Sequence, residues 1–140
     1  MTGSQKLAHI IAAILVVMAT LGFASGHDGF GAALRLNTDT AAVHAPAALF
    51  GFIAARMGRR AADLYLVAVG LLLAADAFAG ATRGMFYLSF ASLRGAVEPL
   101  AKPARYVAVL PHAVLGVIAL IAGLRSANAA AAQRRDLPPS

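Results

Sequence analysis

The run LAHIIAAILVVMATLGFA, from Leu7 to Ala24, contains no Asp, Glu, Lys or Arg and decides the fold class of this chain. Its length matches the roughly 20 apolar residues that a helix needs to cross the hydrocarbon core of a bilayer. Three further apolar stretches follow, at about residues 41–55, 61–79 and 106–124. None alternates as a strand does, and an open sheet edge would leave backbone groups unpaired in lipid. We therefore predict an all-α fold, a four-helix transmembrane bundle.

Composition supports a membrane protein. The chain has 140 residues, of which 60% are hydrophobic and 13% are charged, and its mean hydropathy is +0.74. A soluble domain of this length cannot hide so much apolar surface from water, whereas a bilayer can. We predict one domain over residues 1–125, followed by a polar C-terminal tail over residues 126–140. The chain has no cysteine, which excludes disulfides and thiolate metal sites.

The formal net charge of +6 indicates topology and contact with anionic lipid rather than nucleic-acid binding, because the basic residues flank the apolar spans. Counting Lys and Arg on each side gives an excess on the side of Lys6, Arg56, Arg59, Arg60, Arg125, Arg134 and Arg135 over that of Arg35, Arg83, Arg94, Lys102 and Arg105. This predicts a multi-pass protein of the bacterial inner (cytoplasmic) membrane with both termini in the cytoplasm. The alternative for residues 1–24 is a cleaved signal peptide.

Two spans share a pattern of one histidine followed by three small residues. His44 is followed at +4, +7 and +11 by Ala48, Gly51 and Ala55, and His112 by Gly116, Ala119 and Gly123. These offsets place the four residues on one helix face. The pattern favours two related helical hairpins, the first span with the second and the third with the fourth, although Ala and Gly are frequent enough to match by chance. We predict close helix packing at Gly51, Ala55, Gly116 and Gly123.

Most His, Asp and Glu side chains lie near one end of the predicted spans. The candidate cluster consists of His27, Asp28, His44, Asp76 and His112. Imidazole and carboxylate groups are ligands for transition metals and parts of proton relays. Asp76 and His112 are the pair most clearly inside a span. The alternative is a structural role, in which histidines cap helix ends and Asp76 pairs with Arg83 or His112.

The segment between the third and fourth spans is unusually apolar for a loop. It contains Met85, Phe86, Tyr87, Phe90 and Arg94, a mixture typical of a segment that lies along the membrane interface. Such a segment can dock on a partner subunit or cover this chain's own bundle.

The runs Leu36-Asn37, Val43-His44 and 49–56, together with His112 and Leu115-Gly116-Val117, are similar to motifs of an uncharacterised family of small four-helix bacterial membrane proteins. The resemblance implies the four-helix fold over most of residues 7–125 and implies no activity.

The sequence has no phosphate loop, dinucleotide fingerprint, nucleophile elbow or zinc-protease motif. We predict a non-enzymatic protein, an accessory or stabilising subunit of a larger membrane complex or a self-associating scaffold. Its expected partners are the lipid bilayer and other membrane subunits or itself, without nucleic acid. No cofactor is specified, and a transition metal or haem would suit the first alternative, a metal- or haem-binding protein. The second alternative is a small transporter or proton-path protein centred on Asp76.

Overall fold

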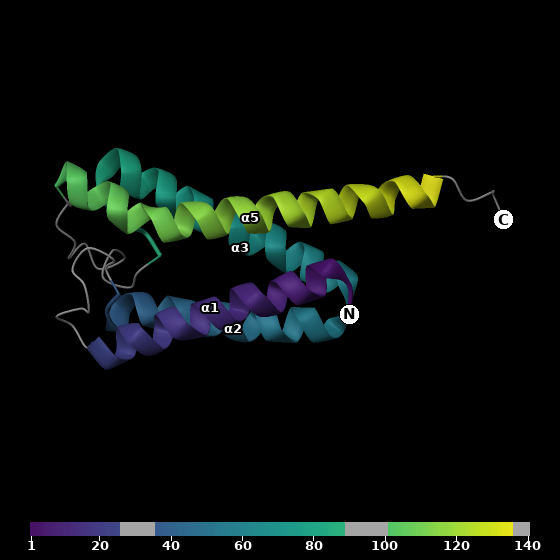
Figure 1. Ribbon diagram of the computed structural model, residues 1–140, viewed down its shortest axis with the longest axis horizontal. Helices are drawn as coiled ribbons and strands as arrows, with labels where there is room; N and C mark the ends of the chain where they lie inside the picture. Colours follow the sequence, from purple (N-terminus) through teal and green to yellow (C-terminus); the bar gives the residue numbers. More distant parts are fainter. Residues whose placement is uncertain (26–35, 89–100, 136–140) are drawn as a thin grey trace.

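Long helices make up nearly all of the described chain. A computed structural model describes residues 1–25, 36–88 and 101–135, and within these ranges it contains four long helices (Figure 1). They are α1 (Gly3–Ser25), α2 (Thr38–Met57), α3 (Arg59–Arg83) and α5 (Lys102–Arg135). The predicted all-α four-helix bundle is confirmed.

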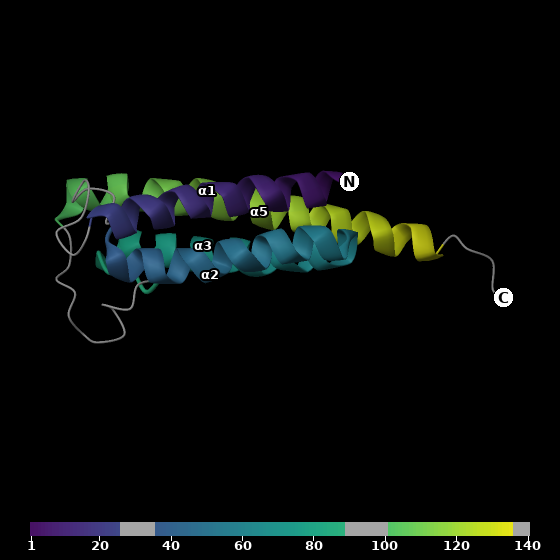
Figure 2. The same ribbon diagram turned by 90° about the horizontal axis from the view of Figure 1, so that it is seen from below.

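Successive helices run in opposite directions, so the bundle has two distinct ends (Figures 1 and 2). We call the end where α1 and α3 stop and α2 and α5 begin the site end. The opposite turn end holds Gly58, which joins α2 to α3 with a φ of 117°. The start of α1 and the end of α5 both lie at the turn end, and α5 projects beyond the other helices there. Their assignment to the cytoplasm stays a prediction.

The helices pack most extensively as two hairpins, α1 against α2 and α3 against α5, whereas the backbones of α2 and α5 do not approach each other. The α3–α5 contact is a close backbone approach. A Cβ built on Gly116 would lie 2.7 Å from the Ala74 nitrogen, and one on Gly70 would lie 2.6 Å from the Leu120 nitrogen. Glycine at these two positions therefore allows the helices to touch. The pairing is the one predicted, while the proposed relationship between the hairpin sequences stays a prediction.

Every helix is longer than its predicted apolar span. α2 begins at Thr38 rather than at residue 41, and α3 continues to Arg83 rather than stopping at residue 79. Hydropathy falls at a helix end because polar residues suit the membrane surface, but backbone hydrogen bonding continues through them. α5 extends through the alanine run 129–132 to Arg135, so most of the predicted tail is helical, since alanine is the best helix former. Residues 136–140 lie outside the described residues.

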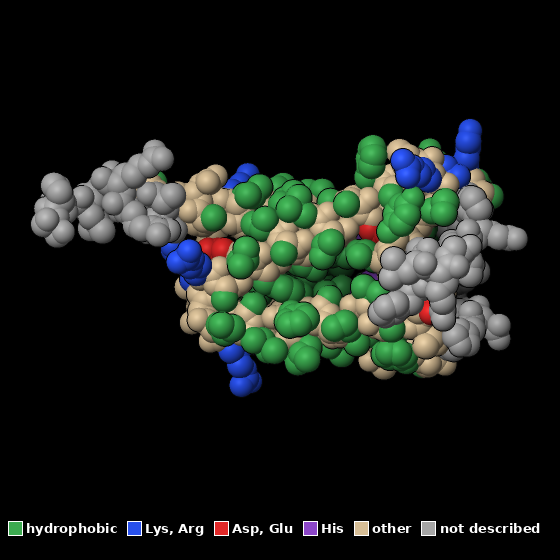
Figure 3. All heavy atoms as spheres, turned by 180° about the vertical axis from the view of Figure 1, so that it is seen from behind, with side chains coloured by type: hydrophobic (Ala, Val, Ile, Leu, Met, Phe, Trp, Pro, Cys, Tyr) green, Lys and Arg blue, Asp and Glu red, His purple; other side chains and the backbone are tan. Residues whose placement is uncertain are grey.

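The exterior of the bundle suits a bilayer. All four helices are long and apolar enough to cross a membrane. A broad hydrophobic band covers the surface between two ends at which Lys and Arg side chains gather (Figure 3). Large apolar side chains exposed on the helices include Leu64, Leu71, Phe78 and Leu110. Exposure of this apolar surface to water would cost free energy, whereas contact with lipid does not. By helix length and hydropathy the chain is a small multi-pass membrane protein.

The interior combines a few large side chains with many small ones. Ile11, Leu15, Leu66 and Leu73 fill the centre, and they pack with alanines that include Ala8, Ala48, Ala62 and Ala119. The small residues allow the helices to approach closely around these larger side chains. Polar side chains are therefore confined to the two ends of the interior, and the site end holds most of them.

Candidate functional site

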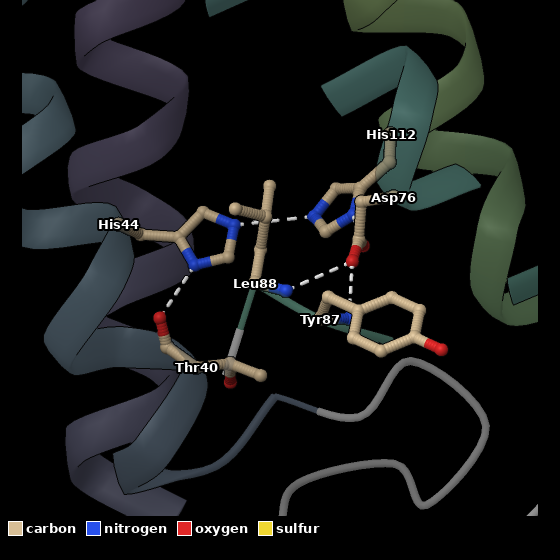
Figure 4. Close-up of polar contacts among 6 residues, drawn as sticks. All are labelled: Thr40, His44, Asp76, Tyr87, Leu88 and His112. Carbon is tan, nitrogen blue, oxygen red and sulfur yellow. Dashed lines mark hydrogen bonds and ion pairs between the residues drawn. The ribbon is translucent and has the colours of Figure 1, made fainter. Parts of the chain in front are cut away.

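Three of the five predicted cluster residues meet inside the bundle near its site end (Figure 4). His44 comes from α2, Asp76 from α3 and His112 from α5, and their exposed fractions are 3%, 3% and 7%. Burial of three ionisable side chains within membrane-spanning helices is costly unless each has a partner. His27 and Asp28, the other two predicted members, lie outside the described residues.

The three side chains form one continuous hydrogen-bonded chain. His44 Nδ1 lies 2.6 Å from the Thr40 carbonyl oxygen, and His44 Nε2 lies 3.2 Å from His112 Nε2. His112 Nδ1 lies 2.7 Å from Asp76 Oδ2. The two imidazoles thus bridge α2 and α5, whose backbones do not meet, and the Asp76 carboxylate holds the second imidazole from α3.

The hydrogen-bond partner of Nδ1 in each histidine determines whether the Nε2 atom of the same ring carries a proton or a lone pair. A carbonyl oxygen only accepts, so His44 Nδ1 must donate its proton to Thr40. With Asp76 ionised, His112 Nδ1 likewise donates to the carboxylate. Both Nε2 atoms of neutral imidazoles then present lone pairs to each other at 3.2 Å. A hydrogen bond between the two Nε2 atoms then requires one further proton, and a metal ion can take the place of that proton.

The start of α2 fixes the position of His44. Asn37 is the N-cap, and its side chain accepts from the Thr40 backbone N–H at 3.0 Å while the Thr40 hydroxyl accepts from the Asn37 N–H at 3.0 Å. This reciprocal capping box holds the first turn in a defined geometry. The Thr40 carbonyl one turn before His44 is therefore a rigid acceptor that orients the imidazole.

The segment after α3 folds back over Asp76. α3 ends at Gly84, which adopts a left-handed conformation with φ 74° and reverses the chain. The backbone N–H groups of Tyr87 and Leu88 then donate to Asp76 Oδ1 at 2.6 and 2.9 Å. Asp76 accepts three hydrogen bonds in all, a number that stabilises the ionised carboxylate in a buried position.

Phe86, in the segment predicted to lie along the interface, packs into this chain's own bundle. Its ring is 6% exposed, packs against Gly80 and Val109, and meets the His112 ring edge-on with centroids 6.5 Å apart. It is therefore part of the wall of the site. Met85 is partly buried and Tyr87 is exposed, with its hydroxyl accepting from Arg83 at 3.2 Å. Phe90 and Arg94 lie outside the described residues.

A small cavity adjoins the two imidazoles. It has room for about one water molecule. Its walls are formed by Met18, Leu36, Thr40, His44, Phe86, Leu88, Ala108 and His112. An apolar groove between α1 and α5 shares Met18, Leu36, Ala108 and His112 with this cavity, so these residues lie where the two spaces meet. Apart from the histidines, Thr40 and the Met18 thioether, the cavity wall is apolar.

The predicted helix-packing residues form contacts between helices of the same chain. Gly51, Ala55, Gly116 and Gly123 are all buried. A Cβ on Gly51 would lie 2.6 Å from the Tyr65 hydroxyl, and one on Gly123 would lie 3.0 Å from the Asp63 carbonyl. These positions therefore support contacts between helices of one chain, and they leave no small-residue seam of this set exposed for a second chain.

Sequence reasoning did not include Thr40, Met18 or the backbone of Tyr87 and Leu88 in the site. The Asn37-x-x-Thr40 spacing is a capping signature and was a usable signal for Thr40. Met18 lies in an unbroken apolar run and carries no such signal. The backbone donors are invisible in sequence because any residue type supplies an N–H. Asp76 also had two candidate partners, and it pairs with His112, whereas Arg83 binds Tyr87.

No family model, curated protein or solved structure matches this chain. The resemblance to a family of small four-helix membrane proteins therefore stays a prediction. Interpretation of the site depends on its own geometry.

Proposed function

We propose that this protein is a non-enzymatic membrane protein that binds a metal ion between His44 and His112. The observation that carries the proposal is the pair of Nε2 atoms facing each other at 3.2 Å, with both Nδ1 atoms held by acceptors. A metal with bonds of about 2.0–2.1 Å separates two nitrogen ligands by about 3.3–3.6 Å when the angle between the bonds is tetrahedral to trigonal. Little movement is needed to admit such an ion.

The surroundings of the imidazoles support the same proposal. Histidines that bind metals almost always donate their second ring N–H to a carboxylate or a backbone carbonyl. His112 donates to Asp76 and His44 donates to Thr40, so both kinds of support occur side by side. These hydrogen bonds fix the tautomer that leaves Nε2 available as a ligand.

A proton path along the membrane normal is less well supported. The hydrogen-bonded chain from Thr40 to Asp76 links α2, α5 and α3 (Figure 4). Toward the turn end the interior is filled by Leu15, Leu66 and Leu73. The Tyr65 hydroxyl, buried in that direction, has no hydrogen-bond partner among the described residues. Among the described residues the polar chain has no continuation toward the turn end, which favours a cation held between the imidazoles over a path across the membrane.

A haem between the histidines is also poorly supported. Two imidazoles that bind one haem lie on opposite faces of the porphyrin, which must fit between them. A separation of 3.2 Å and a cavity the size of one water molecule leave no space for that ring. The small-residue positions predicted for helix packing are buried inside one chain and therefore offer a second chain no contact surface, and the accessory-subunit and scaffold hypotheses stay predictions.

Metal titration of the purified protein in lipid nanodiscs tests the proposal, with bound metal measured by mass spectrometry across Cu(I), Ag(I), Zn(II), Co(II) and Ni(II). We expect one ion per wild-type chain and loss of binding in His44→Ala and His112→Ala. The control is His9→Ala, because His9 Nδ1 makes the same bond to a carbonyl one turn earlier, at 3.0 Å, but lies near the turn end. Wild-type protein that binds none of these ions refutes the proposal, as does equal binding by the two site variants.

A further inference from the structure

We infer that the ion is a soft monovalent metal, Cu(I), and that the thioether of Met18 is its third ligand. This inference rests on the proposed metal site and specifies its ligand.

The charge balance of the site favours a monovalent ion. Asp76 is the one carboxylate that contacts the described imidazole pair, and His44 and His112 are neutral when they act as ligands. One monovalent cation therefore brings the site to zero net charge. A divalent cation would leave an uncompensated positive charge inside the membrane-spanning helices, where such a charge is costly.

The available ligands favour a soft ion. Within the described ranges no group of three or more His, Cys, Asp and Glu side chains is placed to hold a metal. Zn(II) normally takes four nitrogen, sulfur or oxygen ligands, which two imidazoles and a water-sized cavity do not supply. Thioether and imidazole ligands suit Cu(I). Met18, a thioether residue, lines the same cavity as the two histidines, together with the hydrocarbon side chains of Leu36, Phe86 and Leu88.

Met18 is the only methionine among the residues that form this wall. It also lines the groove between α1 and α5. An unbranched thioether with three rotatable bonds adapts readily to such a position. Met18 comes from α1, His44 from α2 and His112 from α5, and a three-ligand site would therefore join three of the helices.

The test compares Cu(I), kept reduced by ascorbate, and redox-inert Ag(I) with Zn(II) in wild-type protein and in Met18→Leu. Leucine keeps the volume and removes the sulfur, and Met57→Leu is the control because Met57 is 74% exposed at the turn end. We expect Cu(I) and Ag(I) to bind at least about 100-fold more tightly than Zn(II), and Met18→Leu to weaken both monovalent ions by about 10-fold or more. X-ray absorption of the Cu(I) protein should show one sulfur and two nitrogen neighbours, with the sulfur lost in Met18→Leu.

The outcomes separate this inference from the proposed function. Tighter binding of Zn(II) than of Cu(I), abolished by His112→Ala, overturns the choice of ion while the metal site itself stands. Unchanged Cu(I) affinity and an unchanged sulfur neighbour in Met18→Leu overturn the assignment of Met18. Absence of binding by every ion overturns the proposed function as well.

Discussion

Replacing Asp76 by Asn is the most informative single change to this site. The Asn oxygen can keep the two bonds from the Tyr87 and Leu88 N–H groups, which are 2.6 and 2.9 Å long in the native protein. Its NH₂ group then takes the place of Oδ2 and donates to His112 Nδ1. His112 must carry its proton on Nε2 instead and donate it to His44 Nε2. Every hydrogen bond of the chain survives, and no cation is needed between the rings.

Asp76→Asn should therefore separate metal affinity from stability. Removal of a carboxylate that supports a ligating histidine typically lowers metal affinity by about 10–100-fold. Here the substitution also removes the charge that balances the ion and reverses the tautomer of His112, so we expect a loss of at least about 100-fold, or about 2.8 kcal/mol. The melting temperature of the metal-free protein should change by only a few degrees, because the polar groups of the chain keep partners.

Titration with Ag(I) in nanodiscs measures the affinity, and nitrogen-15 NMR of labelled histidine reports which nitrogen of His112 carries the proton. Asp63→Asn is the matched control, since Asp63 is a buried acid on the same helix but lies at the turn end. Unchanged Ag(I) affinity in Asp76→Asn would refute the argument that the carboxylate orients and neutralises the site. A large loss of stability in the metal-free variant would show that the tautomer exchange does not occur.

Three further predictions concern the supporting structure, and each is measured as a free energy of unfolding in detergent. Gly116→Ala should destabilise the protein by about 1–3 kcal/mol, because the new Cβ would lie 2.7 Å from the Ala74 backbone nitrogen. The control Val117→Ala, on the exposed face of the same helix, should destabilise it less. Equal effects of the two substitutions would contradict the close α3–α5 contact. Gly84→Ala should cost about 1–2 kcal/mol, because φ is 74° and Arg105 Nη2 lies 2.7 Å from the added Cβ, and a neutral result would count against this turn. Asn37→Ala should cost about 1 kcal/mol through loss of the cap at α2, and Thr38→Ala should cost less.

The helices could be predicted because hydropathy reports directly on what lipid tolerates. The stretch from Leu7 to Ala24 and its three counterparts all lie within observed helices. Their ends could not be located by hydropathy, since residues such as Thr38 and Arg83 remain in the hydrogen-bonded helix while they meet the membrane surface. The path of the chain after Gly84 could not be predicted from the sequence either. It depends on the left-handed conformation of Gly84 and on backbone N–H groups that donate to Asp76.

The site was predictable as a set of residues and not as a geometry. An acid and two histidines inside apolar spans stand out because each is costly there, and this cost pointed to His44, Asp76 and His112. The contact between the two imidazoles could not be anticipated, since α2 and α5 do not touch along their backbones. The direction in which each ring points follows from the Thr40 carbonyl and the Asp76 carboxylate, and their positions are set by the tertiary structure.

The division of the site between two hairpins has a consequence for biogenesis. His44 belongs to the hairpin that leaves the ribosome first, and both Asp76 and His112 belong to the one that follows. The two halves acquire a shared ligand site only after the second hairpin has entered the membrane and docked against the first. An ion bound there favours the docked arrangement by mass action, by about 2.7 kcal/mol when its concentration is about 100 times the dissociation constant. Occupancy would thus distinguish a finished bundle from two hairpins that have been inserted but not yet joined.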